Sequence, residues 1–423
     1  MRPLSTAASS NATGPVTAAS HQFDPFDPPY QQDPYPVLSQ LRANEPVFFS
    51  PELGTWVVTR HETVRKVLRD SERFSATIAS DPLKPLCPHA RAIITGSEFD
   101  VPPMLVNNDP PSHTGYRALF SEPLNRPRFE SLEPFIRETV DVYLDRLLAG
   151  GRPADLVKGL TWDVPALVLF RLLGVPAEDV AMVKSYADSR VVLTWGRPTD
   201  DEQVRLATGA VEFFRYATSL VARKEQAPAD DYLSDLIRMR AGDDTRVCLG
   251  DLSAMAFNLL FAGHETTSSA AANLFKAVLP ERDLWSRICS GEQALMPVVE
   301  EGLRFDPPVQ AWRRLSKEDV ELDGVFIPAG SRLLLMFAAA NRDPQQFPQP
   351  DRFEPDRRNV LQHTSFGMGL HYCLGAPLAR LEVKVMLEQV ARRIPAMELV
   401  AGQAWEYTPN TSFRALRRLM VTW

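Results

Sequence analysis

One thiol in this chain stands in a setting that is typical of a metal ligand. Cys373 follows His371 in a loop that also carries Gly367, Gly369 and Gly375. Because glycine adopts backbone angles that other residues avoid, N–H groups of this loop can converge on a thiolate and offset part of its charge. We therefore expect Cys373 to bind a metal rather than to fill the core.

The surroundings of Cys373 favour haem iron over zinc. No further cysteine or histidine stands at the spacing of a tetrahedral zinc site. A thiolate opposite the open position of haem iron favours cleavage of the O–O bond of dioxygen. His371 is placed to donate to a haem propionate, and Phe366, which opens the loop, is assigned to the same cofactor site. The alternative is a glycine-rich turn with an incidental buried cysteine.

A second set of polar residues interrupts an apolar helix that we expect from about 252 to 278. Glu265 and Thr266 follow the small residues Ala262 and Gly263, which leave room for oxygen and substrate. The Thr266 hydroxyl is expected to bend the helix by bonding to a carbonyl one turn earlier. Glu265 and Thr266 are then candidates to relay protons to dioxygen. Taken alone, a kinked core helix with a surface glutamate explains this segment equally well.

A third group consists of charged side chains near the cysteine loop. Glu301 and Arg304 are three residues apart and share a helix face. In isolation this is an ordinary exposed ion pair. Arg352, in an aromatic segment shortly before the loop, is expected to complete a buried Glu-Arg-Arg network that holds the loop in place.

Four further cations are candidates for binding the carboxylates of a cofactor. His113 and Arg117 are one helical turn apart, and Arg313 and Arg314 follow a tryptophan. Arginine suits two-point binding of carboxylates. Each of these residues alone is typical of solvated surface.

Composition excludes several classes of protein. The chain has 423 residues, of which 44% are hydrophobic and 23% are charged, which is globular composition with enough apolar content for a core. The net charge of −7 gives no electrostatic case for binding nucleic acid or an anionic membrane. The four cysteines are widely spaced, and neither a signal peptide nor an apolar run long enough to span a membrane is apparent. We expect a cytoplasmic monomer.

The periodicity of the chain predicts a mostly α protein with small β-sheets. Residues 1–20 are expected to be a disordered tail, and residues 21–423 a single domain. Helices are expected from about 35, over 61–70, through much of 112–305 and over 377–393, and short strands near 54–59, 320–322, 332–336 and 419–422. A proline-rich irregular segment over 75–111 is expected to be functional.

Together these groups resemble the cytochrome P-450 family of haem-thiolate monooxygenases, over nearly the whole chain from Tyr35 to Trp423. Segments 51–60, 194–198, 311–314 and 409–414 are similar to the haem domains of bacterial self-sufficient members, which carry a fused reductase with FMN and a [2Fe-2S] cluster. This chain contains no such flavin domain or cysteine cluster. We expect either a haem domain separated from its reductase or a stand-alone relative that uses a separate one.

The resemblance implies a helix-rich fold with haem b between the long central helix and the cysteine loop. It implies that Cys373 is the axial ligand, that Thr266 and Glu265 supply protons, and that electrons come from NAD(P)H through an FMN/ferredoxin-type reductase. The propionates would be bound by His113, Arg117, His371 and either Arg314 or Arg313.

The resemblance also implies a substrate pocket with an apolar lining. A small to medium hydrophobic or aromatic substrate, undergoing hydroxylation or O-dealkylation, is therefore expected. A peroxide-driven peroxygenase and a non-catalytic haem sensor are the alternatives. The expected lining residues are Ile78, Leu83, Leu86, Phe257, Phe261, Ala262, Val309, Thr411 and Phe413.

Overall fold

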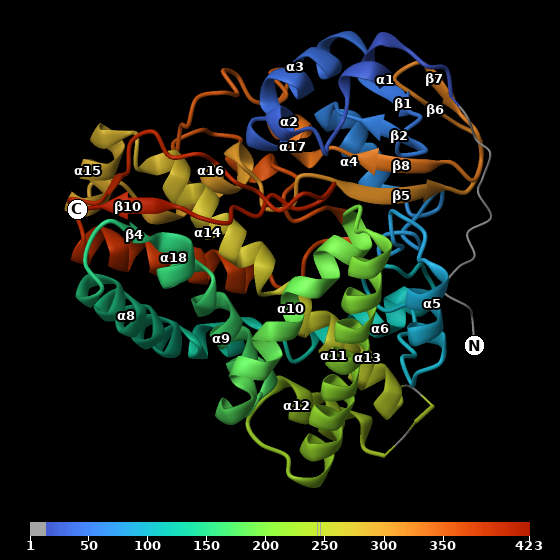
Figure 1. Cartoon of the computed structure of the whole chain (residues 1–423), viewed down its shortest axis with the longest axis horizontal. Coiled ribbons are helices and arrows are strands. Elements are labelled where there is room, and N and C mark those ends of the chain that lie inside the picture. The colour runs from blue at the N-terminus through green and yellow to red at the C-terminus, as the bar shows by residue number, and fades with distance from the viewer. Residues whose placement is uncertain (1–13, 243, 246) are drawn as a thin grey trace.

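A five-stranded sheet lies beside a larger helical part of the molecule (Figure 1). The computed structural model describes residues 14–242, 244–245 and 247–423, with the backbone alone over 184–189. Within the described residues, no helix has both the length and the apolar character needed to cross a membrane.

The helices follow one another along the chain with short connections between most of them. Several begin with a side-chain cap; Thr199 and Glu202, for example, form a reciprocal capping box at the start of the longest helix. The α-helices are α1 (Ala18–Gln22), α2 (Pro28–Gln32), α3 (Tyr35–Asn44), α4 (His61–Arg69), α5 (Pro88–Thr95), α6 (Ser112–Ser121), α7 (Arg126–Ser131), α8 (Glu133–Ala149), α9 (Asp163–Leu173), α10 (Val180–Trp195), α11 (Asp200–Gln226), α12 (Tyr232–Arg240), α13 (Leu249–Ala262), α14 (Glu265–Val278), α15 (Arg282–Ser290), α16 (Leu295–Phe305), α17 (Phe337–Ala340) and α18 (Ala376–Arg393). Shorter helical turns are η1 (Val157–Thr161), η2 (Ala177–Asp179), η3 (Val360–Gln362) and η4 (Gly369–His371).

The larger sheet brings together strands from both ends of the chain. Its order is β1-β2-β8-β5-β3, formed by β1 (Val47–Ser50), β2 (Thr55–Val58), β8 (Arg332–Leu335), β5 (Trp312–Ser316) and β3 (Phe74–Ser75). A second sheet pairs β4 (Ala154–Asp155), β10 (Met420–Thr422) and β9 (Glu398–Leu399), and a hairpin is made by β6 (Val320–Leu322) and β7 (Val325–Ile327). In the larger sheet Trp312 is opposite Leu335 and Arg314 is opposite Leu333, which fixes the faces on which β5 presents its side chains.

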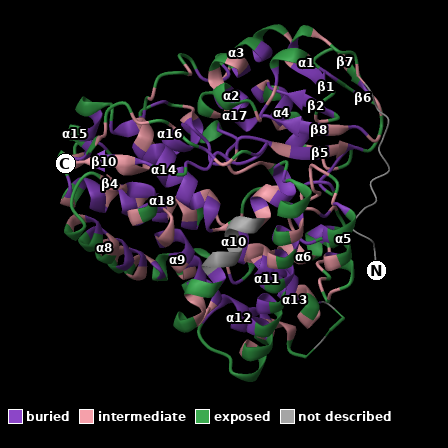
Figure 2. Cartoon of the chain, in the orientation of Figure 1, coloured by how far each residue is buried: buried purple, intermediate pink, exposed green. Residues whose placement is uncertain are grey.

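The core is formed where the central helices meet. Helix α14 packs against α9, α16 and α18, and α13 packs against α11. Buried residues run along these helices and across the larger sheet (Figure 2). Burial of this apolar surface stabilises the arrangement and sets the positions of the start of α14 and of the loop before α18.

The predicted fold class is confirmed, with three differences in detail. The apolar helix expected over 252–278 is two helices, α13 and α14, separated at Gly263 and His264. The segment 75–111 is not wholly irregular, because it contains α5. Residues 1–13 of the expected tail lie outside the described residues, whereas α1 begins within that tail at Ala18 and buries Ala19.

Candidate active site

The backbone of the cysteine loop is held by its glycines. Gly367 and Gly369 adopt φ values of +69° and +66°, a region that favours glycine. A Cβ atom on Gly369 would lie 2.9 Å from the carbonyl oxygen of Leu68 at the end of α4. The Cys373 N–H donates to the carbonyl of Phe366 at 2.9 Å. The loop is therefore closed on itself and packed directly against α4.

The thiol of Cys373 faces a cavity. Burial raises the pKa of this thiol, and the N–H groups of Gly375 and Ala376 and the positive charge of Arg117 act in the opposite direction. Cys373 is exposed and is one of the residues that line the cavity. The loop thus presents one sulfur atom, supported by backbone donors, to the cavity.

This cavity has a volume of about 330 Å³ and a mostly apolar lining. Cys373 from the loop before α18 and Thr266 from the start of α14 both line it, so helix packing brings together two residues that are more than a hundred positions apart. The apolar side chains of the lining include Met104, Leu105, Val106, Leu169, Leu172, Met255, Phe261, Val309, Trp312, Phe337, Phe366, Leu378 and Phe413.

The break between α13 and α14 places a hydroxyl group at the cavity. The Thr266 Oγ1 donates to the carbonyl of Ala262 at 2.8 Å, which is the bond to the preceding turn that the sequence predicts. Ala262 is exposed to the cavity. Glu265 is buried next to Thr266 but does not line the cavity wall.

A group of cations lies beside the same cavity. The rings of His113 and His371 have centroids 4.3 Å apart, and Arg117, Arg314 and His371 line the cavity. His371 Nδ1 is 2.9 Å from the carbonyl oxygen of Leu105, and Arg117 Nη2 donates to the carbonyl of Tyr372 at 2.7 Å. Four residues that the sequence singled out separately are therefore gathered in one place.

The electrostatics of these basic side chains favours the binding of an anion. Burial, followed by the charges of Arg314 and His113, lowers the pKa of His371 to about 3. Burial also lowers the pKa of Arg314 to about 10, opposed by Asp109. Neither ring nitrogen of buried His113 has a hydrogen-bond partner among the described residues. Buried polar groups normally have partners, so an acidic group of a bound molecule fits here.

An ion-pair network lies between α16 and the segment before the cysteine loop. Arg304 donates to both carboxylate oxygens of Glu301 at 2.7 and 2.8 Å. It also donates to the carbonyls of Asn341 and Pro350, each at 2.9 Å. The Glu354 N–H donates to Glu301 at 2.7 Å. The pair is fully buried, so it is not the exposed ion pair that the sequence left open.

Comparison with known proteins agrees with this geometry. Residues 293–394, which include the network and the cysteine loop, match the family Cytochrome P450. The cytochrome P450 monooxygenase PikC of Streptomyces venezuelae is 36% identical over 93% of this chain and 92% of its own length. The chain belongs to the cytochrome P450 family.

Two solved structures place this cytochrome P450 more narrowly. An intact type IV self-sufficient cytochrome P450 monooxygenase is 39% identical with a TM-score of 0.92, over 97% of this chain and 54% of that longer one. Cytochrome P450 CREJ in complex with (4-ethylphenyl) dihydrogen phosphate is 34% identical with a TM-score of 0.92, over 96% of this chain and 100% of that one. The predicted resemblance to P450 haem domains, including those of self-sufficient members, is confirmed.

Membership of the P450 family implies a haem, and the residues present fit one. A thiol facing an apolar cavity supplies an iron ligand. The unpartnered nitrogens of His113, with the basic side chains of Arg117, Arg314 and His371 beside the cavity, suit two carboxylates.

Two of the predicted arginines, Arg313 and Arg352, do not lie at the sites that the sequence predicts for them. Because side chains alternate along β5, Trp312 and Arg314 line the cavity, whereas Arg313 donates to the carbonyls of Asp81 at 2.8 Å and Thr194 at 3.3 Å. We therefore retain Arg314, and not Arg313, as a candidate propionate partner.

The second arginine of the ion-pair network is Arg357 rather than Arg352. Arg357 is buried, with Nε 3.5 Å from Glu301. Arg352 is exposed; its guanidinium donates to Gln349, and only its carbonyl reaches the network, by accepting from Arg304. The chain turns sharply between residues 352 and 357, and spacing alone did not predict which arginine points inward.

Sequence analysis missed a second support of the cysteine loop. Glu300 Oε2 is 3.0 Å from His363 Nε2 and accepts from Arg380 Nη2 at 3.1 Å. Arg380 also donates to the hydroxyl of Tyr372 at 3.1 Å. Although burial acts to raise it, the pKa of Glu300 is lowered by the bonds from His363 and Arg380. Two adjacent glutamates in an apolar helix, Glu300 and Glu301, were the signal in the sequence.

Some of the residues that were predicted to line the substrate pocket line the cavity, and others do not. Phe261, Ala262, Val309 and Phe413 line the cavity. Ile78, Leu83, Phe257 and Thr411 do not: Phe257 packs among Phe99, Phe213 and Phe214, and Thr411 bonds to the carbonyl of Trp195. The irregular segment contributes instead through Ser80, Met104, Leu105 and Val106.

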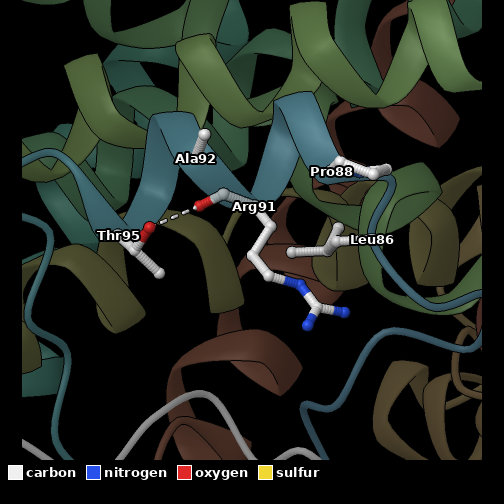
Figure 3. Close-up of a pocket in the computed structure, with 5 residues that line it drawn as sticks. All are labelled: Leu86, Pro88, Arg91, Ala92 and Thr95. Carbon is white, nitrogen blue, oxygen red and sulfur yellow. Dashed lines mark hydrogen bonds between the residues drawn. The ribbon is translucent and has the colours of Figure 1, made fainter.

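Leu86 lies at a separate surface depression of about 440 Å³ (Figure 3). Pro88, Arg91, Ala92 and Thr95 of α5 complete its lining. The Thr95 hydroxyl is satisfied by the carbonyl of Arg91 at 3.0 Å (Figure 3). This depression offers one exposed cation and no group suited to catalysis, so Leu86 is not a substrate contact.

Proposed function

We propose that this P450 inserts one oxygen atom from O2 into a small to medium hydrophobic or aromatic substrate, by hydroxylation or O-dealkylation. The observation that carries the proposal is the shared cavity of Cys373 and Thr266. Haem b, bound through the Cys373 thiolate, supplies the redox chemistry that activates dioxygen.

The residues around the cavity move protons and exclude water. The Thr266 hydroxyl donates its one hydrogen to the Ala262 carbonyl and presents its lone pairs at the cavity wall, where it accepts a proton and passes it on. Buried Glu265 precedes it and is the candidate proton source. The apolar lining keeps bulk water from the reacting groups.

Two sets of charged residues position the cofactor. His113, Arg117, Arg314 and His371 are proposed to bind the propionates, and Phe366 lines the same site. The Glu301 network holds the segment before the loop, and Glu300 with Arg380 holds the loop itself. The thiol is thereby kept in a single position.

The aromatic side of the cavity supports an aromatic substrate. Phe261 and Trp312 each meet Phe413 edge to face, with ring centroids 6.3 and 6.0 Å apart, an arrangement that suits flat apolar molecules. The CREJ relative was solved with an aryl compound.

Electrons are proposed to come from NAD(P)H through a reductase carrying FMN and [2Fe-2S], either fused in a longer chain or separate. The self-sufficient relative, of which this chain spans about half, supports the fused arrangement. We further propose that residues 21–423 form one haem-binding domain that acts as a monomer in the cytoplasm.

The test is turnover of a panel of alkylaromatic compounds by the haem-loaded chain. We expect product with a surrogate reductase and NADPH, and much slower product formation with hydrogen peroxide alone. Equal rates with peroxide would indicate a peroxygenase. An absorbance spectrum that no compound shifts, together with no product, would indicate a haem sensor.

A further inference from the structure

A half-buried arginine with a buried guanidinium nitrogen, which sequence analysis did not single out, lines the cavity. Arg190, on α10, is one of the lining residues. Burial lowers the pKa of its guanidinium to about 10, and no acid among the described side chains acts against that effect. No carboxylate among the described residues pairs with Arg190, and its Nη1 has no hydrogen-bond partner there. A buried cation without a counter-ion is costly and therefore needs an explanation.

The guanidinium of Arg190 is held in a defined position by α13. Its Nη2 donates to Asn258 Oδ1 at 2.9 Å. Asn258 in turn donates its amide to the carbonyl of Ala254 at 2.8 Å, which directs its oxygen to Arg190. The guanidinium also lies over the rings of Phe257 and Phe261, 4.8 and 5.0 Å from their centroids. A fixed guanidinium with a free N–H edge is prepared to receive an acceptor.

A second donor without a partner lies at the same side of the cavity. Trp195 also lines the cavity, and its indole Nε1 has no hydrogen-bond partner among the described residues. Its ring stacks on Phe261 with centroids 6.0 Å apart. Arg190 and Trp195 thus both contact Phe261 and offer two unused N–H groups. A water molecule would satisfy a donor but would leave the charge of Arg190 without compensation.

Arg190 and Trp195 lie at a distance from Thr266, the residue proposed to relay protons. Asn258, Ala262 and Thr266 follow at intervals of four residues and all line the cavity. Asn258 and Ala262 lie on α13, about 6 Å apart along its axis, and Thr266 lies beyond the break, on α14. A molecule held at Arg190 would therefore reach Thr266 with its opposite end.

We propose that Arg190 binds an anionic group of the substrate, a carboxylate or a phosphate monoester, at the end remote from the carbon that is oxidised. This inference rests on the proposed function, which it narrows to acidic substrates with an apolar or aromatic body. Asn258 is a positioning residue for Arg190, and Trp195 is a second donor to the anion.

The test is calorimetric titration of the haem-loaded chain at pH 7.5 with three matched probes: 4-ethylphenol, 4-ethylbenzoate and 4-ethylphenyl phosphate. Since hydrogen bonds to charged groups are the stronger ones, we expect at least one anion to bind about ten-fold or more tightly than the neutral phenol. The anion that is preferred identifies the acidic group. Equal or tighter binding of the phenol would overturn the proposal.

Three variants test whether Arg190 is responsible for the preference for anions. Arg190→Leu is expected to abolish the preference for anions, and Arg190→Lys to retain part of it. Arg91→Leu removes one exposed cation at the surface depression and is expected to leave the preference unchanged. A preference that survives in Arg190→Leu would overturn the proposal.

Thermal denaturation tests whether Arg190 contributes to the stability of the fold. Because Arg190→Leu removes a charge that no described carboxylate pairs with, this variant is expected to melt at the same temperature as the unchanged protein or higher. A large drop in melting temperature would show that Arg190 is structural and would contradict the proposal.

The two proposals fail in different ways. The reduced CO complex of the unchanged protein reports thiolate ligation without any substrate. If its thiolate-type absorbance is present and the anion preference is absent, only the assignment of Arg190 is wrong. If the absorbance is absent, the proposed function is wrong whatever the titrations show.

Discussion

Arg304 and Glu301 form a two-point ion pair whose side chains are both completely buried, one turn apart on α16. The remaining N–H groups of Arg304 reach carbonyls at residues 341, 350 and 352. One guanidinium therefore ties α16 to the long segment that leads into the cysteine loop.

Replacing Glu301 by glutamine should destabilise the protein strongly. The substitution leaves Arg304 charged and buried without a counter-ion, which typically costs about 3–5 kcal/mol. Urea denaturation of the haem-loaded protein measures this loss, and haem content per chain should fall as well. Glu354→Gln is the control, because its carboxylate is half exposed and should contribute less than about 1 kcal/mol.

Arg357 and Arg352 should differ in importance. Arg357→Ala removes a buried guanidinium beside Glu301 and is expected to cost about 1–3 kcal/mol. Arg352→Ala changes only an exposed side chain and should stay within about 0.5 kcal/mol. The same denaturation experiment measures both variants. The opposite order would restore Arg352 as the second arginine of the network.

Substitution of Cys373 by serine should remove the thiolate signature. We expect complete loss of the thiolate-type absorbance of the reduced CO complex, since the ligand sulfur is gone. Cys289→Ser, on α15, is the matched control and should keep the full absorbance. Persistence of the band in Cys373→Ser would contradict the assignment of Cys373.

In Thr266→Ala, electron consumption should continue while product formation falls. Loss of the hydroxyl at the cavity removes a proton donor, an effect that typically amounts to about 10²-fold or more. NADPH oxidation should continue, with hydrogen peroxide released in place of product, and haem content should be unchanged. Thr266→Ser keeps the hydroxyl and is expected to retain most of the coupling; equal coupling in the alanine variant would count against the relay.

Glu382 on α18 should make stability depend on pH. It is buried, it lines the cavity, and its Oε2 has no partner among the described residues. Burial raises its pKa well above the ordinary value, so the folded protein keeps a proton that the unfolded chain loses above about pH 4.3. The contribution of Glu382 to the free energy of unfolding is therefore greatest below that pH and falls as pH rises, by at most about 1.4 kcal/mol per unit.

Glu382→Gln should remove this dependence and stabilise the protein at pH 7. Denaturation curves from pH 5 to pH 8 measure the slope. Glu388→Gln, six residues further along α18, should act in the opposite direction: the bond from Arg137 lowers the pKa of Glu388, so its contribution is present at neutral pH and is lost in acid. An unchanged slope in Glu382→Gln would show that Glu382 is paired or charged in the folded protein.

Local patterns in the sequence were enough for part of the fold and site. Most of the longer helices and the strands β2, β6, β8 and β10 were predicted because hydrophobic periodicity and caps act over a few residues, whereas α5 and the other described strands were not predicted. Cys373 and the Thr266 bond to Ala262 were predicted for the same reason, since the glycine loop and the threonine act on their own neighbourhood. The separation of α13 from α14 was not foreseen, because it depends on packing around the break.

The amino-acid sequence by itself placed a thiol in a glycine loop, a hydroxyl and a carboxylate in an apolar helix, and a Glu301–Arg304 pair on one helix face, a set that predicts haem-thiolate chemistry. Only the tertiary structure decided which of several equivalent side chains turns inward. It selected Arg314 over Arg313 through the register of β5, and Arg357 over Arg352 through a turn of the backbone. It also brought Arg190 into the cavity, where no acidic side chain among the described residues pairs with it. Such choices depend on contacts between distant segments, and spacing along the chain carries no information about them.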